Sequence, residues 1–443
     1  MTTLNIDTLV RTAVFGDGDA KADARRTIHL EARRRGAVPS SVYPLYMAMG
    51  RGEVRPFTVP AFNIRALTYD SARALFRAAM RHGVGAFIFE IARSEIGYTE
   101  QRPAEYAACV LAAAIAEGFQ GPVFIQGDHF QASAKKWVTP EGQAAETKAL
   151  ESLIDEAIAA EFFNIDIDTS TLVDLGFDTR DEQQRANYEG TAHLTKYIRE
   201  REPEGMPISI GGEIGEVGKY NTQPDEVRAY MDGLLRLLGG AHGISKISVQ
   251  TGTSHGGVPL ADGSIAQAKI DFDVLRETTR ICRGEYGIAG SVQHGASTLP
   301  ESVFNKFPEA EAVEIHLATG FQNMILDAPT FPQAMKDEIR DFCFANCADE
   351  RKAGQTDEQF VYTTRKKALG PFKRRMWDMP DDAKQPIVRD LEAKFEFLME
   401  KLAVFDTKDV VAKYVTTSRE LPAYAAASEE LTAAAVVDPN EGE

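Results

Sequence analysis

Histidines close or follow several short apolar runs of this sequence, in a pattern that could bind a metal ion. Of the eight histidines among the 443 residues, four lie at such positions: His129, His255, His294 and His316. Neutral imidazole is the commonest metal ligand in proteins, and a catalytic zinc has three protein ligands and one open position. A hydrogen-bonded polar cluster is the alternative, because a lone histidine at a strand end is more often structural. Three or four converging histidines favour a divalent ion, and a ligand set rich in imidazole favours zinc.

Carboxylates end the same apolar runs. In chain order they are Asp128, Asp166, Asp168 and Glu213. A carboxylate beside a metal ligand can act as a general acid or base. The remaining histidines lie in helical or loop contexts and are expected to be ordinary surface or core residues: His29, His82, His193 and His242.

These polar residues can meet only if the apolar runs form one sheet. Eight runs rich in Val, Ile and Phe alternate with Ala-rich helical segments: residues 56–62, 85–91, 122–128, 162–168, 207–213, 244–250, 288–294 and 312–318. This alternation is typical of β/α units, and eight strands indicate a closed (β/α)8 TIM barrel, whose active site lies at the C-terminal ends of the strands. An open doubly wound sheet is the main alternative. It usually carries a glycine-rich turn after its first strand, and PAFNIRALTYD (60–70) contains no glycine.

The flanking segments differ from the barrel pattern. Residues 1–55 are predicted to form an N-terminal helical lead-in, and residues 56–327 the barrel with its metal site. Residues 328–443 contain apolar positions at helical spacing and are predicted to form a helical C-terminal extension, with an Ala- and acid-rich tail from about Ala425.

Composition excludes several classes of partner. The formal net charge of -17 argues against nucleic acid and anionic membranes, which both require a basic surface. No apolar run approaches the roughly 20 residues of a membrane span, and the first residues lack the features of a secretory signal. The four cysteines are too sparse for a disulfide framework. We expect a cytoplasmic protein with reduced thiols that associates as a homo-oligomer, as barrels of this type usually do.

Several motifs, taken in chain order, resemble the class II (zinc-dependent) fructose- and tagatose-bisphosphate aldolases. They span residues 56–327: VPAFNI (59–64), GDHF (127–130), FFNIDIDTS (162–170), GGEIGEVG (211–218), TGTSHGG (251–257), KIDFDVL (269–275), QHGAS (293–297) and EIHLATGFQN (314–323). The resemblance implies a (β/α)8 barrel, a zinc ion and reversible cleavage of a phosphorylated ketose, such as fructose 1,6-bisphosphate, into dihydroxyacetone phosphate and an aldehyde.

The resemblance also implies roles for individual residues. His129, His255 and His294 match the three zinc ligands, and Glu213 matches the acidic residue of an alternative metal position. Asp128 matches the catalytic aspartate, which would remove the hydroxyl proton of the bond being cleaved and return it on condensation.

Other matching positions surround the substrate. Those expected to bind it are Asn63, Asp168, Gly256, Gly295, Ser297, His316 and Thr319. Backbone amides of the glycine-rich turns, with the two hydroxyls of this set, would hold a phosphate after the seventh and eighth strands, which is a frequent phosphate site of barrels.

The sequence departs from the family pattern in three places. The family commonly has a lysine soon after the second ligand motif, whereas here none occurs until Lys269. The asparagine of the family's eighth strand is replaced by His316. The loop after the fifth strand is short, which leaves Glu216 as the candidate for the family's catalytic loop glutamate. These departures bear on the substrate more than on the metal.

A non-catalytic function is the competing hypothesis. The GDHF and IDTS segments, with EIARSEIGYT (90–99), also resemble the accessory, stabilising subunit of bacterial tagatose-bisphosphate aldolases. A subunit without turnover has no reason to retain three histidines and the aspartate together, so we favour the enzyme.

One basic run stands out in this acidic chain, TRKKALGPFKRR (364–375). It could be a solvated helix end, or it could contact an anion through charge-assisted hydrogen bonds. A bisphosphate site would need a second basic anchor, which Arg93, Lys135 or this run could supply.

Overall fold

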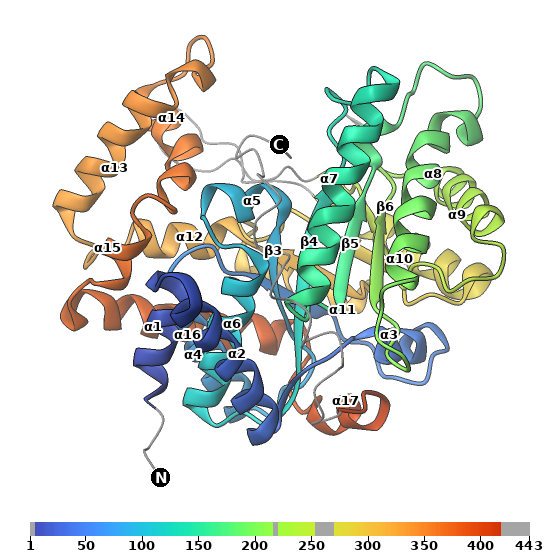
Figure 1. Ribbon diagram of the computed structural model, residues 1–443. Coiled ribbons are helices and arrows are strands. Elements are labelled where there is room, and N and C mark those ends of the chain that lie inside the picture. The colour runs from blue at the N-terminus through green and yellow to red at the C-terminus, as the bar shows by residue number, and fades with distance from the viewer. Residues whose placement is uncertain (1–4, 216–219, 253–269, 418–443) are drawn as a thin grey trace.

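A closed ring of eight parallel strands forms the centre of the molecule. The computed structural model describes residues 5–215, 220–252 and 270–417. In order, the ring consists of β2 (Val59–Asn63), β3 (Ile88–Ala92), β4 (Gly121–Gln131), β5 (Asn164–Asp168), β6 (Ser209–Glu213), β7 (Lys246–Val249), β8 (Ser291–Gln293) and β9 (Glu314–Leu317). Each strand pairs in parallel with the next, and β9 pairs with β2, so the sheet closes. The predicted (β/α)8 barrel is therefore confirmed (Figure 1).

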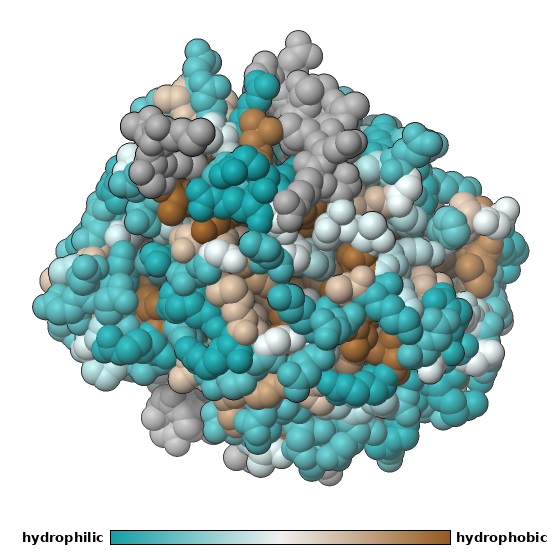
Figure 2. Space-filling model, turned by 90° about the horizontal axis from the view of Figure 1, so that it is seen from below, coloured by the Kyte–Doolittle hydropathy of each residue, from teal (hydrophilic) through white to brown (hydrophobic). Residues whose placement is uncertain are grey.

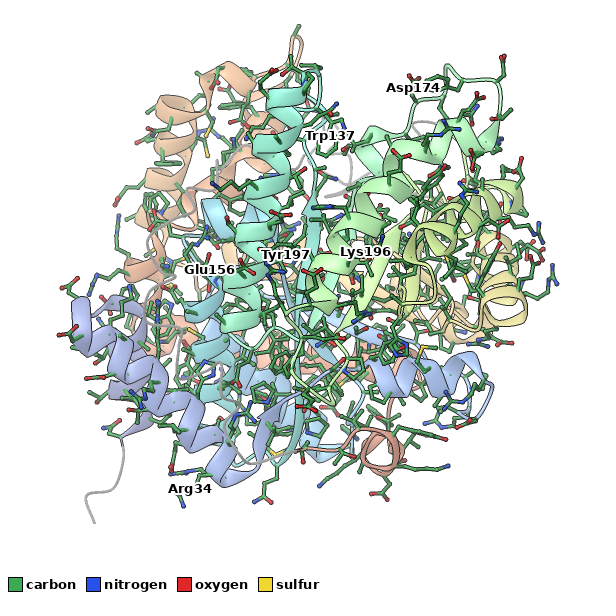
Figure 3. The ribbon with its side chains drawn as sticks, turned by 45° about the vertical axis from the view of Figure 1, so that its right-hand side comes forward. Arg34, Trp137, Glu156, Asp174, Lys196 and Tyr197 are labelled. Carbon is green, nitrogen blue, oxygen red and sulfur yellow. The ribbon has the colours of Figure 1, made fainter. Side chains whose placement is uncertain are left out.

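Helices connect the strands and cover the outside of the barrel. They are α4 (Thr68–Arg81), α5 (Arg93–Tyr98), α6 (Pro103–Glu117), α7 (Pro140–Ala159), α8 (Arg180–Arg199), α9 (Pro224–Leu238), α10 (Phe272–Ile281), α11 (Lys306–Glu309) and α12 (Thr319–Leu326). Local signals set their ends: Pro140 begins α7, and α6 stops at Gly118, which adopts a φ of 72°. Neighbouring helices also contact one another, since the Tyr197 hydroxyl of α8 donates to Asp155 of α7 at 2.7 Å. Figure 3 shows Tyr197 between these two helices.

The N-terminal segment contains more than the predicted helices. Between α2 (Gly18–Arg35) and α3 (Tyr43–Gly50) lies a short strand, β1 (Ala37–Pro39), which pairs with the start of β4 outside the ring; α1 (Ile6–Phe15) precedes them. A strand of three residues is too short to produce an alternating pattern, so no periodicity predicted it.

Helices also make up the C-terminal segment. They are α13 (Gln333–Asn346), α14 (Asp357–Thr364), α15 (Lys373–Trp377), α16 (Asp381–Lys401) and α17 (Lys408–Tyr414). Phe395 of α16 packs against Phe62 of β2 and Phe321 of α12, with ring centroids 5.2 and 5.0 Å away. The helices α13 and α15 lie on the same side of the barrel as α1 and α2 (Figure 1), where Trp377 meets Phe15 at 5.3 Å. The extension therefore shares the core of the barrel.

The surface seen in Figure 2 is mainly polar and the cysteines are buried, as the composition predicts. Seen from below, the molecule is mostly hydrophilic, with only scattered hydrophobic residues (Figure 2). All four cysteines are buried and free, as expected. Within the described ranges, no helix has both the length and the apolar character needed to cross a membrane.

Candidate active site

An irregularity in β4 brings two consecutive polar side chains to the mouth of the barrel. In regular strands, successive side chains point to opposite faces, so Asp128 and His129 should diverge. The pairing of β4 with β5 shifts between Gly127 and Phe130, and His129 adopts a φ of 41°. Positive φ is uncommon for a residue with a side chain, and bulges of this kind re-aim side chains beside active sites. The bulge therefore lets both residues face the site.

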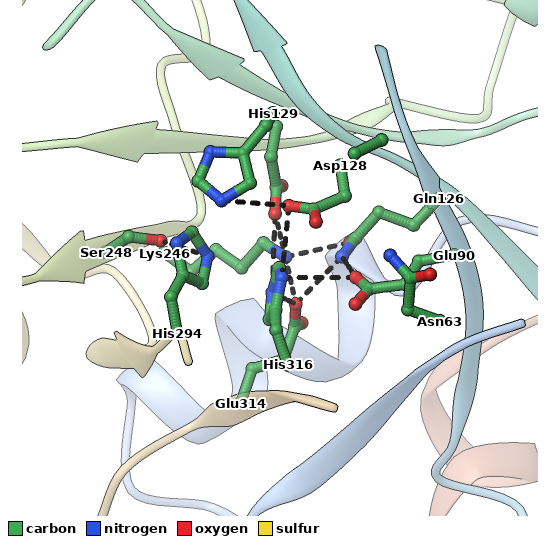
Figure 4. Close-up of polar contacts among 12 residues, drawn as sticks. Asn63, Glu90, Gln126, Asp128, His129, Lys246, Ser248, His294, Glu314 and His316 are labelled. Carbon is green, nitrogen blue, oxygen red and sulfur yellow. Dashed lines mark hydrogen bonds and ion pairs between the residues drawn. The ribbon is translucent and has the colours of Figure 1, made fainter. Parts of the chain in front are cut away.

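Three side chains from three strands form the first candidate metal-binding set: His129 of β4, Glu213 at the end of β6 and His294 directly after β8. Their ligand atoms all lie within 4.8 Å of one another. Glu213 Oε2 is 3.3 Å from His129 Nδ1 and 3.6 Å from His294 Nδ1. The rings of His129 and His294 lie near each other in Figure 4, and their centroids are 4.3 Å apart. The structure thus brings together two of the three predicted histidines and the predicted carboxylate.

The chemistry of this set fits a divalent cation. Two imidazoles and one carboxylate are a donor combination found at catalytic zinc sites. Burial, together with the positive charges of His316 and His129, lowers the pKa of His294 to about 4. His294 is therefore neutral at pH 7, which is the form that binds a metal. Burial opposes the charged form of His129, but Asp128 and Glu213 raise its pKa well above the usual value, so metal binding there would displace a proton.

Asp168 holds the ring of His129 from outside this set. Its Oδ2 lies 3.1 Å from His129 Nδ1, and its Oδ1 accepts from the backbone N–H of Ser170 at 3.0 Å. A carboxylate that contacts a ring nitrogen fixes the orientation of a histidine side chain, and here Asp168 and Glu213 share Nδ1 of His129. Asp168 was predicted to contact substrate, and the structure places it against a candidate ligand.

Asp128 and His316 adjoin the candidate metal site. Asp128 Oδ1 lies 3.1 Å from His316 Nδ1, and the rings of His316 and His294 are 4.2 Å apart. Burial disfavours the charged form of Asp128, but the neighbouring His129 and His316 hold its pKa well below the usual value. The carboxylate is therefore ionised at neutral pH and able to accept a proton.

A layer of buried polar side chains lies inside the barrel around His316 (Figure 4). Its members share almost complete burial and direct polar contacts: Glu90, Gln126, Asp166, Lys246 and Glu314. The ammonium of Lys246 donates to Asp166 Oδ2 at 2.9 Å and to Gln126 Oε1 at 2.8 Å, and it also contacts Glu314. Asp166, Glu314 and His316 could themselves hold a cation, but the Lys246 ammonium already lies between the two carboxylates.

Four members of this layer are not among the predicted site residues: Glu90, Gln126, Lys246 and Glu314. The spacing of two of them in the sequence could have indicated that they belong to the site. Lys246 stands two residues before Ser248 in β7, and Glu314 two residues before His316 in β9. Because residues two apart share a face of a strand, charged residues at these spacings within apolar runs pointed into the barrel.

The predicted phosphate residues lie together after β8 and β9. Gly295 turns the chain with a φ of 65°, and the Ser297 hydroxyl accepts from the backbone N–H of Gly320 at 3.1 Å. Thr319 is buried at the first position of α12. Ser297 and Gly320 line a cavity of about 330 Å³ that also reaches Lys394 of α16.

The Asn63 side chain contacts the carboxylate of Glu95, which is not among the predicted site residues. Its Nδ2 donates to Glu95 Oε2 at 2.7 Å, and the other oxygen of Glu95 is 2.6 Å from the Arg65 guanidinium. Arg65 and Glu95 follow β2 and β3 and therefore lie at the same end of the barrel as the candidate metal site.

The basic run is largely paired with acidic side chains. Arg365 contacts Asp327, Lys367 contacts Glu350, Lys373 contacts Glu105 and Arg375 contacts Glu338. These pairs join the C-terminal extension to itself and to the barrel. Lys366 lies 5.7 Å over the Tyr98 ring, and burial with the nearby Arg65 charge lowers its pKa to about 7.

Arg93 is likewise held within the protein. Its Nη1 donates to Glu146 Oε1 and to the Gln131 carbonyl, each at 2.5 Å, and both partners of the ion pair are buried. Because its guanidinium is already paired with Glu146, we do not expect Arg93 to bind the second phosphate. Three predicted site residues, Glu216, His255 and Gly256, lie outside the described residues.

Several solved structures are similar to this chain. A Sinorhizobium meliloti protein named as a tagatose 6-phosphate kinase is similar with a TM-score of 0.52 and 16% identity, over 81% of this chain and 99% of that chain. The fructose-bisphosphate aldolase of Campylobacter jejuni is similar with a TM-score of 0.48 and 16% identity, over 82% of this chain and 94% of that one. A Coccidioides immitis protein named as a fructose-1,6-bisphosphate aldolase gives a TM-score of 0.46 and 16% identity, over 82% and 96%.

A structural likeness at 16% identity indicates the fold alone, whereas a sequence comparison can identify the family. No curated protein sequence matches the chain significantly. The family model of class II fructose-bisphosphate aldolases, in contrast, matches residues 50–377, which is most of the chain and includes every residue of the candidate site. The chain belongs to the class II fructose-bisphosphate aldolase family.

Proposed function

We propose that this protein is a metal-dependent aldolase that reversibly cleaves a phosphorylated ketose, of the fructose 1,6-bisphosphate type, into dihydroxyacetone phosphate and an aldehyde. Family membership supports aldolase activity and a divalent metal. The observation that carries the proposal is the juxtaposition of two imidazoles and a carboxylate, His129, His294 and Glu213, beside the ionised Asp128.

Each group has a defined task in this reaction. His129, His294 and Glu213 would hold the ion, with His255 as the further predicted ligand. When bound, a divalent ion, which we propose to be zinc, supplies Lewis-acid stabilisation for the negative charge that carbon–carbon cleavage leaves on the ketose fragment. Asp128 takes the proton from the hydroxyl at the cleaved bond and returns it on condensation.

The substrate's phosphate would lie on the opposite side of the mouth from β4. The turn at Gly295, the Ser297 hydroxyl and the buried Thr319 place donors after β8 and β9, the usual phosphate position of such barrels. Because Asp128 belongs to β4, phosphate and base would occupy separate parts of the site.

The decisive experiment measures metal content and cleavage together. Purified protein should contain about one divalent ion per chain, and it should release dihydroxyacetone phosphate from one member of a panel of phosphorylated ketoses, detected through a coupled NADH-consuming reductase. Asp128→Asn should keep the metal and lose about 10²- to 10⁴-fold in turnover, the range for one acid-base group. Asp174→Asn, at an exposed loop position, is the matched control and should behave as wild type.

Absence of cleavage would favour the accessory-subunit hypothesis. That conclusion requires fully metal-loaded wild-type protein that cleaves no ketose of the panel and an Asp128→Asn variant indistinguishable from it in ligand binding. Stimulation of a separate aldolase by this inactive protein would then support a stabilising function.

A further inference from the structure

His316 lies at a point where carboxylates from four strands of the barrel converge. Its Nδ1 is 3.1 Å from Asp128 Oδ1, whereas His129 Nε2 is 3.9 Å from the same oxygen. Asp128 therefore makes its shorter described histidine contact with a residue of β9, across the barrel interior, and not with its neighbour in sequence.

The ring of His316 is held in place by partners that are themselves fixed. Its Nε2 lies 2.7 Å from Glu314 Oε1, and Glu314 also contacts Lys246 and Tyr46. Glu90 Oε2 lies 3.1 Å from the ring Nδ1 and accepts from Gln126 at 3.1 Å. All of these side chains are buried, so the imidazole has little freedom to turn.

The contact with Asp128 has a defined direction. An ionised carboxylate can only accept hydrogen bonds, so the Nδ1 that faces Asp128 and Glu90 must donate. A carboxylate fixed at one oxygen keeps one orientation of its second oxygen. Catalytic groups must be held close to their productive geometry, and a misplacement of about 1 Å can cost about 10²-fold in rate.

We propose that His316 is a positioning residue for Asp128, and that its Nδ1–H holds the carboxylate in the orientation needed for proton transfer. This inference rests on the proposed function, in which Asp128 moves the proton. The motif pattern that the sequence resembles has asparagine where this chain has His316, so the imidazole itself is a departure from that pattern.

A double-mutant cycle tests whether His316 acts through Asp128. His316→Leu should lower kcat by about 10²-fold, with little change in KM and in metal content. His316→Asn, whose amide nitrogen takes the place of Nδ1 as an N–H donor, should recover much of this loss. In the Asp128→Asn background, His316→Leu should cause no further loss, because residues that act as a unit are not additive.

Two further variants control for indirect effects. His82→Leu removes another histidine paired with a carboxylate, at 2.7 Å from Glu396, and it should leave kcat unchanged. If His316→Leu fails to fold because it leaves buried carboxylates without their partner, Glu90→Gln in the same chain removes one of those charges and provides the soluble variant.

Crystal structures of wild type and His316→Leu supply a readout that needs no activity. The proposal expects the Asp128 carboxylate to turn or become disordered in the variant. An unmoved Asp128, or losses that multiply in the double variant, would overturn it. If wild-type protein cleaves no phosphorylated ketose, the proposed function fails, and the two crystal structures still decide whether His316 positions Asp128.

Discussion

Replacing Lys246 by methionine tests the charged layer inside the barrel. Methionine keeps most of the side-chain volume and removes the ammonium that donates to Asp166, Gln126 and Glu314. The exposed fraction of the Lys246 side chain is 1%, and those of Asp166 and Glu314 are 8% and 0%. The substitution therefore leaves two carboxylates in the protein interior without their cation.

The magnitude follows from that burial. Removing one partner of a buried ion pair costs about 3–5 kcal/mol, because the remaining charge stays desolvated. An unfolding entropy of about 2.1 cal/mol/K per residue over 443 residues corresponds to about 0.9 kcal/mol/K. Lys246→Met should therefore lower Tm by about 3–5 °C near pH 8, where the carboxylates would be charged.

The effect should shrink as the pH falls. Burial raises the pKa of Asp166 to about 6, although the charge of Lys246 opposes this rise, and the same charge holds the pKa of Glu314 well below normal. Without Lys246, the folded-state pKa of each carboxyl rises, and that of Asp166, already raised by burial in the wild type, moves further above its unfolded value. A carboxyl whose folded pKa is raised destabilises the protein above that pKa and ceases to do so once it is protonated. The difference in Tm between wild type and Lys246→Met should therefore be smaller at pH 5 than at pH 8.

Thermal unfolding followed by circular dichroism at pH 5, 6, 7 and 8 measures this difference. Lys401→Met is the matched control: its ammonium lies 3.4 Å from Glu400 at the surface, so its effect should stay within about 0.5 kcal/mol at every pH. Equal Tm values for wild type and Lys246→Met at pH 8, or a difference that grows on acidification, would refute the reasoning.

Three further predictions concern the mouth of the barrel. Ser297→Ala combined with Thr319→Val should raise KM for a phosphorylated ketose and weaken inhibition by inorganic phosphate; unchanged values would mean that the phosphate lies elsewhere. Chelation should remove the ion and the activity together, and His129→Ala should lower metal content measured by mass spectrometry, which a retained full complement would contradict. Arg93→Met should cost about 3–5 kcal/mol in denaturant unfolding by breaking its buried pair with Glu146, yet leave KM unchanged, whereas a large rise in KM would restore Arg93 as a phosphate anchor.

Sequence patterns were sufficient for the barrel because each strand carries its own signal. The eight predicted runs coincide with β2 to β9, and their closing residues include Asp128, Asp168 and Glu213, which the fold brings to one end. That step needs only the rule that parallel barrel strands present their C-terminal ends together. The short strand β1 carries no comparable signal, since three residues show no periodicity.

The positions of the strands could not predict which side chains of the site contact one another. Asp168 and Asn63 are predicted to bind the substrate, and within the protein they contact His129 and Glu95, which the strand positions do not indicate. Which carboxylate meets which donor depends on side-chain geometry within a few ångströms, and on the bulge at His129, whose left-handed φ leaves no mark in the hydrophobic pattern.

The buried layer shows why stability and catalysis are linked in this chain. Lys246 compensates Glu314, Glu314 holds the Nε2 of His316, and the Nδ1 of His316 meets Asp128. A charge in the interior is costly unless it is paired, so each member of this series depends on the next for its own stability. Replacing Lys246, the member of this series farthest from Asp128, by an apolar residue should therefore disturb the orientation of Asp128 as well as the stability of the folded state. On this argument Lys246→Met lowers kcat even at temperatures where the variant is fully folded, and a folded variant with wild-type kcat would show that the layer serves stability alone.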